Sequence, residues 1–505
     1  MDPRPAHFST AFHEVILIFI TCMAQFLCQG GITMSLSTME LVLDSFAGPG
    51  NQVDDTKKVW FMGSFALTVG TFILVSGRLG DLFGLKQIFT IGWFWCTVWS
   101  LVTGLSTYLN SVIFFIVCRA FHGIGFALLL PCAMGILGSV YPNGSRKNLA
   151  FGLVGASGPT GATIGALMAA VVAQLAWWPW AFWILAIVCF IFGVLLIYYI
   201  PPNLNANKYT WKQAWDQLDV LGTCTGVCGL ILLNFVWNQG PVVGWKNPYI
   251  IVLLVLAVVL IVGFFYLERT VASPLLPASI FNVKIGLVLL CMGLGWGSFG
   301  VWQYYYWNLV MNLRHYTPIE GGLSYIPFLV LGVIASMIVS VIISRTKPSY
   351  IICFSSVCFM CGCIVLSVTP VVQSYYRMTM GQMFILCWAM DMSFPAAAII
   401  LSNYLPYHHQ GMAGSLVSTV VNYSVSLFLG IATTVELEVR STQPDPTSID
   451  SILKTYRAAL YFGIGVAGLG VLFSLIFIYL QHDDTVGTIE EDEKLETSGP
   501  SIDSL

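Results

Sequence analysis

The sequence predicts an all-α integral membrane protein that crosses the bilayer about fourteen times. Of its 505 residues, 57% are hydrophobic and only 9% are charged, and the mean hydropathy is +0.82. A soluble domain normally carries about 25% charged residues, so most of this chain must face lipid or other helices. The chain also divides into apolar runs of about 20 residues, the length of a spanning helix. The net charge of −3 gives no reason to expect a nucleic-acid partner.

Short polar breaks separate the predicted spans, and many of the breaks contain Pro or Asn. Only the connections 41–58, 201–217 and 437–456 and the tail 481–505 exceed a tight turn. The tail contains an acidic run at 490–493 and is predicted to be a disordered cytosolic segment. The predicted spans are 14–40, 59–78, 88–107, 111–139, 150–173, 180–200, 218–239, 248–267, 285–311, 319–344, 350–369, 376–401, 411–436 and 457–480.

Basic residues in the connections predict the orientation of the chain. Lys and Arg are more frequent on the side that carries both termini than on the opposite side. Because cytosolic loops are enriched in these residues, both termini are predicted to lie in the cytosol, with residues 1–13 forming an N-terminal tail. The plasma membrane is the expected location, with the vacuolar membrane as the alternative.

A weak internal repeat predicts how the spans are grouped. Pro131 and Pro142 are eleven residues apart at the end of the fourth span, and Pro395 and Pro406 have the same spacing at the end of the twelfth. Both pairs leave the membrane on the same side, which is typical of a parallel repeat. The predicted architecture is therefore two six-helix bundles plus two inserted central helices. The units are an N-terminal bundle (14–200), a linker with the inserted pair (201–283) and a C-terminal bundle (284–480).

Three motifs occur in order along the first bundle. Residues 77–86 contain Gly77, Asp81, Gly84 and Lys86, which indicates a tight glycine-rich turn with one carboxylate and flanking cations. Residues 119–125 read Arg-Ala-Phe-His-Gly-Ile-Gly, and residues 155–159 end in Gly158-Pro159.

This series of motifs resembles the major facilitator superfamily, and in particular its group of fourteen-span drug:proton antiporters. The stretches 176–181, 234–245 and 390–397 are similar to a fungal subgroup of aminotriazole-resistance and boron exporters, which includes a low-affinity ammonium transporter. The first span departs from the antiporter pattern, because Gln25 and Gln29 stand where an acidic element is usual. The resemblance implies proton-coupled transport, with Gly77, Asp81, Gly84 and Lys86 as a cytosolic conformational latch and Gly158-Pro159 as the antiporter motif. A role that only stabilises the loop is the alternative for Asp81.

Two ionisable residues are expected deep inside spans, where a charge is costly and usually faces a cavity or the bundle interior. Asp391 is the only carboxylate that the predicted spans place at mid-depth, and it is the candidate proton or cation site. Arg119 occupies the family position that faces the cavity and influences proton movement. A structural hydrogen-bonding role is the alternative for each. His122, one turn from Arg119 and in place of the usual Gln, is a candidate proton relay or a packed hydrogen-bonding residue.

Polar side chains that share a helix face are candidates for a substrate cavity. Gln25 and Gln29 are four residues apart, and Trp302, Gln303 and Tyr306 recur at three- and four-residue spacing, as do Asn422 and Ser426. Such faces converge at mid-membrane in transporters built from repeats. An aromatic belt at the membrane interface is the alternative for the cluster around Trp302.

These observations predict a secondary active transporter of a small molecule or ion, which exports its solute against protons by alternating access. A non-transporting nutrient sensor of the same fold is the alternative. The sequence has no phosphate-binding loop for an ATP-driven pump and no extramembrane loop that could hold an enzyme site, so an enzyme is not expected. No cofactor or metal is expected, and the protein is predicted to act as a monomer with protons, solute and lipid as its partners.

Overall fold

The computed structural model describes residues 10–47, 55–141, 145–200, 218–271, 282–343, 345–404 and 411–497, with a few residues of the connections between them. Fourteen helices in this part of the chain are long and apolar enough to cross a membrane. The prediction of an all-α, fourteen-span protein is therefore confirmed. The predicted tail 1–13 and the 201–217 linker lie largely outside the described residues.

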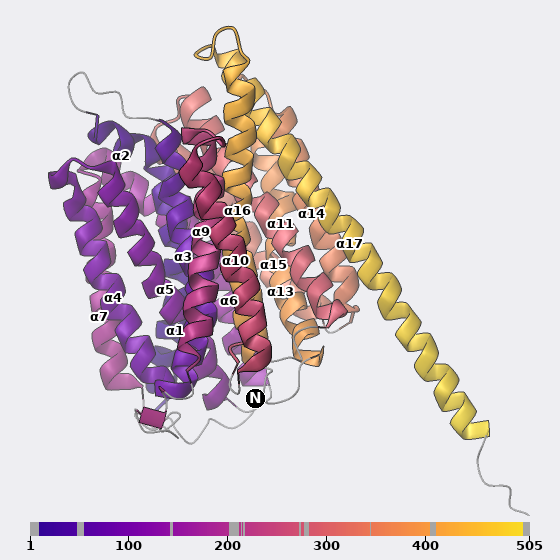
Figure 1. The fold of residues 1–505 in the computed structure, drawn as a ribbon. Coiled ribbons are helices and arrows are strands. Elements are labelled where there is room, and N and C mark those ends of the chain that lie inside the picture. Colours follow the sequence, from indigo (N-terminus) through magenta and orange to yellow (C-terminus); the bar gives the residue numbers. More distant parts are fainter. Residues whose placement is uncertain are drawn as a thin grey trace, which may run out of the picture.

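The helices form two bundles with a pair between them, as Figure 1 shows with the N-terminal bundle in violet and the C-terminal bundle in orange and yellow. The N-terminal bundle contains α1 (Ala11–Ser37), α3 (Val59–Phe83), α4 (Leu85–Leu105), α5 (Val112–Val140), α6 (Ser145–Leu175) and α7 (Pro179–Tyr199). The inserted pair is α9 (Val220–Val243) and α10 (Pro248–Thr270). The C-terminal bundle contains α11 (Val283–Asn308), α12 (Pro318–Ser324), α13 (Ile326–Ile342), α14 (Pro348–Val368), α15 (Met378–Tyr404), α16 (Gly411–Ser441) and α17 (Ile449–Thr497). Short helices are α2 (Met39–Ser45), η1 (Asp55–Lys58), η2 (Ser106–Leu109) and the π-helical η4 (Leu309–Leu313).

Small residues bring α1 and α6 into close contact within the N-terminal bundle. A Cβ on Gly30 would lie 3.1 Å from the Gly161 carbonyl oxygen and 3.5 Å from Cα of Gly165, so the two backbones nearly touch. The Thr33 hydroxyl donates to the Ala162 carbonyl at 2.6 Å across the same contact. Small residues and hydroxyl groups at such contacts are typical of membrane helix pairs, which gain little from the hydrophobic effect.

The two bundles meet along two seams. One seam joins α3 to α16, and the other joins α6 to α12 and α13. The inserted helix α9 packs on α10, on α16 and on α3, so it covers the first seam. The division of the chain at residues 200 and 284 stays a prediction.

The turn predicted in the 77–86 motif is shorter than the sequence indicated. Helix α3 continues through Gly77 and Asp81 to Phe83, and only Gly84 leaves the helix, with a φ of 102°. That value lies in the region that favours glycine. The prediction of a turn across the whole motif was wrong, because Gly77 and Gly80 are tolerated in a membrane helix and need no positive φ.

Four further helix boundaries differ from the sequence prediction. Helix α16 continues to Ser441 and α17 starts at Ile449, so the predicted 437–456 connection is short. Charged side chains such as those of residues 438 and 440 end an apolar run without ending a helix. The structure also extends α17 to Thr497, through much of the tail predicted to be disordered, and no proline interrupts the chain between Arg457 and Pro500. The tenth span is two helices, α12 and α13, and α13 begins at Ile326 with Pro327 in its first turn.

We predict that Gly165→Ala loosens the α1–α6 contact. The added methyl group would meet the Gly30 backbone, and overpacking of this kind typically costs about 1–3 kcal/mol. The measurement is the thermal unfolding midpoint of the detergent-solubilised protein. Gly155→Ala on the same helix is the matched control, because a Cβ there meets nothing within 4 Å. Equal midpoints for the two variants would contradict this packing.

Candidate functional site

The candidate site lies where the two bundles touch at mid-length, around Gly332 of α13. A Cβ on Gly332 would lie 3.6 Å from Oδ2 of Asp391 and 2.6 Å from Cβ of Pro159. Asp391 is in the middle of α15, and Pro159 is in the middle of α6. The missing side chain of Gly332 therefore lets the carboxylate of one bundle approach the proline of the other.

The Asp391 carboxylate is incompletely bonded. It has a side-chain hydrogen bond with Ser336 of α13, but its Oδ2 atom is buried without a hydrogen-bond partner among the described residues. Pro395, four residues further along α15, has no N–H to donate to the Asp391 carbonyl. Buried polar atoms are normally hydrogen-bonded, so an orphan carboxylate oxygen calls for an explanation.

Gln25 and Gln29 of α1 lie on the other side of the same proline motif. A Cβ on Gly158 would lie 3.5 Å from Nε2 of Gln25 and 3.9 Å from Cγ of Gln29. The structure thus brings the two glutamines, Gly158-Pro159 and Asp391 to one place. These residues come from α1, α6 and α15, and the sequence assigned them to three separate features.

Arg119 is buried elsewhere in the N-terminal bundle, where its guanidinium is fully engaged. Its Nη2 donates to the Gly31 carbonyl of α1 at 2.5 Å, and its Nη1 lies 2.9 Å from Nδ1 of His122. The guanidinium carbon lies 4.5 Å from the centre of the Phe65 ring of α3. In the part of the chain that the structure describes, no polar contact joins Arg119 to Asp391. The geometry favours the structural alternative for Arg119, as a tie between α1, α3 and α5.

The contacts of His122 fix one neutral tautomer. An arginine guanidinium can only donate, so Nδ1 of His122 must accept, and the ring proton is then on Nε2. Nε2 lies 2.9 Å from Oγ of Ser100, to which it donates. Both ring nitrogens are therefore used in holding Arg119, and we interpret His122 as its positioning residue.

The aromatic face of α11 is packed inside the C-terminal bundle. The Trp302 indole donates to Gln382 at 2.8 Å, and Gln303 donates to the Tyr325 hydroxyl at 3.2 Å. Tyr306 lies 2.9 Å from the Ser324 hydroxyl. Tyr325 connects this cluster to the other bundle, because its carbonyl accepts from Thr163 of α6 at 3.4 Å. A role for the aromatic face in lining a cavity stays a prediction.

Asn422 and the latch motif both lie along the α3–α16 seam. Asn422 donates to the Ser418 carbonyl of its own helix at 2.9 Å. A Cβ on Gly70 would be 3.0 Å from the Asn422 carbonyl carbon, and one on Gly77 would be 3.5 Å from Oγ of Ser415. The seam therefore depends on glycines of α3 that face α16.

Asp81 and Lys86 differ in their surroundings. Asp81 is exposed and forms no ion pair among the described residues. Lys86 donates to the carbonyls of Ile197, at 3.1 Å, and Ile200 at the end of α7. Lys86 thus fastens α4 to α7 inside one bundle, while Asp81 is accessible at the bundle's end.

The contacts along α6 show which end of the second seam is closed. One turn after Thr163 along α6, a Cβ on Gly322 of α12 would lie 3.1 Å from the Cα of Leu167. Near the C-terminal end of α6, the Gln174 side chain accepts from the Ile319 backbone at 2.9 Å. In contrast, a Cβ on Gly152 or Gly155 would meet nothing within 4 Å. The seam is therefore closed from the middle of α6 to the end opposite the chain termini.

Sequence reasoning missed a buried asparagine pair in α9 and a buried glutamate in α16. Asn234 and Asn238 of α9 are almost fully buried; Nδ2 of Asn238 donates to Oδ1 of Asn234 at 2.9 Å, and Ser426 donates to the same oxygen at 3.1 Å. Their four-residue spacing within an apolar span was the available signal. Glu436 of α16 is also buried, although it stood at the edge of a predicted span. The expectation that Asp391 is the only carboxylate at mid-depth stays a prediction, because Glu436 lies near the C-terminal end of α16.

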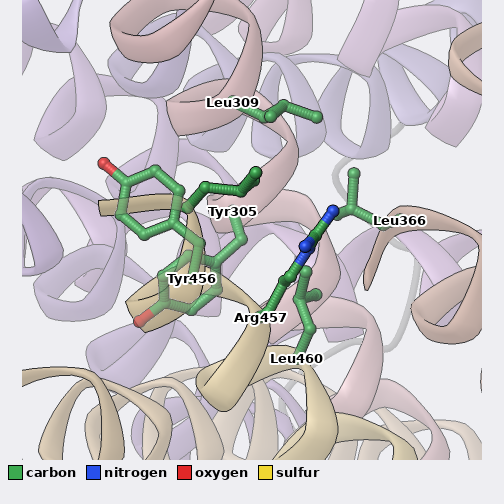
Figure 2. A pocket seen from close by; sticks show the side chains of 7 residues that line it. Tyr305, Leu309, Leu366, Tyr456, Arg457 and Leu460 are labelled. Atoms are coloured by element: carbon green, nitrogen blue, oxygen red, sulfur yellow. The ribbon is translucent and has the colours of Figure 1, made fainter. Parts of the chain in front are cut away.

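The described residues contain no group of three His, Cys, Asp or Glu side chains that could hold a metal ion. A small pocket lies in the C-terminal bundle between α11, α14 and α17, and Asp391 is not among its lining residues (Figure 2). The lining residues are Tyr305, Leu309, Leu366, Leu453, Tyr456, Arg457 and Leu460.

Comparison with known proteins agrees with this architecture. Residues 19–431 match the Major Facilitator Superfamily. The chain is 43% identical to the aminotriazole resistance protein of Saccharomyces cerevisiae over 480 residues, covering 94% of this chain and 86% of that protein. It is 42% identical to the low affinity ammonium transporter of the same yeast, covering 95% and 90% of the two chains. An efflux pump of Aspergillus terreus is 36% identical, with 94% and 89% covered.

A crystal structure of the peptide transporter POT has the same fold, with a TM-score of 0.64 over 95% of this chain and 96% of that one. The two sequences are 14% identical, so this likeness concerns the fold alone.

We predict that His122→Leu destabilises the N-terminal bundle more than His122→Gln does. Leucine leaves the buried Nη1 of Arg119 without an acceptor, which typically costs about 1–3 kcal/mol or more for a charged group, whereas glutamine can still accept. The thermal unfolding midpoints of the two detergent-solubilised variants provide the measurement. A His122→Leu protein as stable as the wild type would show that the ring does not hold Arg119.

Proposed function

We propose that this chain, which belongs to the Major Facilitator Superfamily and is a secondary transporter, exports a small solute in exchange for protons. Its relatives include efflux pumps and an ammonium transporter, and the chain matches them over nearly its whole length. Transport by such a fold requires the seams between the bundles to open and close in turn. The proposal concerns the coupling ion, the direction and the residues involved.

The observation that carries the proposal is the orphan Oδ2 atom of Asp391 at the contact between the bundles. A carboxylate oxygen without a partner can take up a proton, and the proton makes it a hydrogen-bond donor. Because Pro159 of the other bundle packs at Gly332 beside it, separation of the bundles changes the surroundings of this carboxylate. Proton binding at Asp391 is thereby linked to the state of the seam.

The membrane potential supplies enough free energy to drive export of a solute by this exchange. A membrane potential of 100 mV supplies about 2.3 kcal/mol for each proton that crosses. One proton exchanged for one neutral solute would therefore support export against a concentration ratio of about 50, since 1.4 kcal/mol corresponds to a factor of ten.

The site chemistry favours a neutral or cationic solute. Gln25 and Gln29 offer amide groups that can both donate and accept hydrogen bonds. Asp391 supplies a negative charge when it is ionised. Arg119 is engaged by Gly31, His122 and Phe65 and is not available to pair with an anion. Trp302, Gln303, Tyr306 and Asn422 are proposed as outer parts of the path, reached as the seams open.

The remaining parts of the proposal concern the membrane context. Asp81 and Lys86, with Gly77 and Gly84, are proposed as the cytosolic latch that stabilises one state of the transporter. Both termini are placed in the cytosol, and the protein is proposed to act as a monomer in the plasma membrane. The closed end of the α6 seam then faces the outside, so this conformation is closed toward the exterior.

We predict that overproduction of the protein makes cells resistant to at least one of boric acid, aminotriazole and methylammonium. Asp391→Asn should abolish that resistance, because the amide cannot carry a proton. Growth across a concentration series of each solute provides the measurement, with membrane localisation checked by fluorescence.

Asp450→Asn is the matched control, since Asp450 is exposed in the first turn of α17. It should keep full resistance. Full resistance in Asp391→Asn cells, with an unchanged dependence on the pH of the medium, would contradict the proposed coupling role.

A further inference from the structure

Another buried carboxylate lies beside the α3–α16 seam, at the end opposite the chain termini. Glu436 is near the C-terminal end of α16 and has 9% of its surface exposed. Its Oε2 atom accepts a hydrogen bond from the Tyr305 hydroxyl of α11 at 2.6 Å. The mechanism proposed above does not use this group.

The charged groups around Glu436 leave it without a close cation. Lys58 of η1 and Arg440 of α16 are the nearby positive charges. Lys58 is already bonded to Glu40 of α2 at 2.6 Å and lies 3.4 Å from Asp55. Among the described residues, no Lys or Arg nitrogen lies within 4 Å of the Glu436 carboxylate.

The other titratable groups facing Glu436 are tyrosines. Tyr304 and Tyr305 come from α11, and Tyr456 comes from α17. Tyr456 is held by Asn312, whose amide donates to its hydroxyl at 3.2 Å. A buried carboxylate that has a phenol but no cation as its partner is costly to keep ionised, and binding a proton removes that cost.

The Glu436 carboxylate is positioned to respond to opening of the α3–α16 seam. Glu436 and Tyr305 belong to the C-terminal bundle, whereas Lys58, Glu40 and Asp55 precede α3 in the N-terminal bundle. If α3 and α16 separate at this end, Glu436 moves away from the positive charge of Lys58 and towards water. The proton affinity of its carboxylate is therefore coupled to that movement by ordinary linkage.

The small pocket drawn in Figure 2 adjoins the same cluster, because Tyr305 and Tyr456 both line it. Arg457 lines it too, and its Nε atom is buried without a hydrogen-bond partner in the described structure. Tyr305 thus lines the pocket and is bonded to Glu436, so one phenol connects the carboxylate to this pocket.

We propose that Glu436 is a second proton-binding group, which takes up a proton at the end of the transporter opposite the chain termini. The step is the addition of one proton to the carboxylate, with no other bond made or broken. The inference rests on the proposed proton exchange and adds to it a site from which protons enter the cycle. Tyr305 is its positioning residue.

The test is an infrared titration of the full-length protein in liposomes, which needs no transported solute. The C=O band of protonated carboxyl groups is recorded between about pH 4 and pH 9, the range over which buried carboxyl groups titrate. Glu436→Gln should remove one titrating band, and Tyr305→Phe should shift the frequency of that band. Glu438→Gln is the control, because Glu438 is exposed two residues away on the same helix and should leave the band intact.

A second arm separates this inference from the role of Asp391. Glu436→Gln should flatten the dependence of solute resistance on the pH of the medium, and Asp391→Asn should abolish the resistance and remove a different infrared band. A Glu436→Gln spectrum identical to the wild type, or an unchanged pH dependence of resistance, would overturn the inference while leaving the Asp391 proposal standing. Loss of the Glu436 band together with an unaffected Asp391→Asn transporter would refute the Asp391 proposal instead.

Discussion

The structure depends on one constraint: two helix bundles must approach until their backbones nearly touch and still be able to separate. Glycines meet this constraint on both seams. Gly332 receives Pro159, Gly322 receives Leu167, and Gly70 faces the backbone of Tyr423. Few side chains interlock across these contacts, so few must be disentangled when a seam opens. Most of the strong polar contacts instead lie inside a bundle, as with Arg119, or at the inserted helix α9.

Buried polar groups in this protein divide into two kinds. Arg119, His122 and Ser100 satisfy one another and tie helices of one bundle together. Asp391 and Glu436 lie beside a seam, so opening of that seam would change their surroundings. Only the second kind can link proton binding to movement, because a group whose contacts are the same in both states cannot shift the balance between them.

The sequence was sufficient for the fold, because hydrophobic runs of the right length are a direct consequence of the bilayer. It also singled out Asp391 as a candidate, since a charge at mid-span stands out against apolar neighbours. It could not show that Gln25 packs at Gly158 while Asp391 lies near the adjacent Pro159, because that depends on how α1, α6, α13 and α15 pack. Glu436 was missed for a related reason: charged residues near the end of a span look interfacial until tertiary packing buries them.

The most direct test of this account is to lock the second seam. Leu167→Cys with Gly322→Cys places two thiols across it, since a Cβ at residue 322 would lie 3.1 Å from Cα of Leu167. Export of the solute identified by growth is measured before oxidation, after it, and after reduction. The pair Thr33→Cys with Ala162→Cys, inside one bundle, is the control. The account predicts that oxidation stops export only for the first pair and that reduction restores it. Undiminished export with the 167–322 disulfide formed would contradict it.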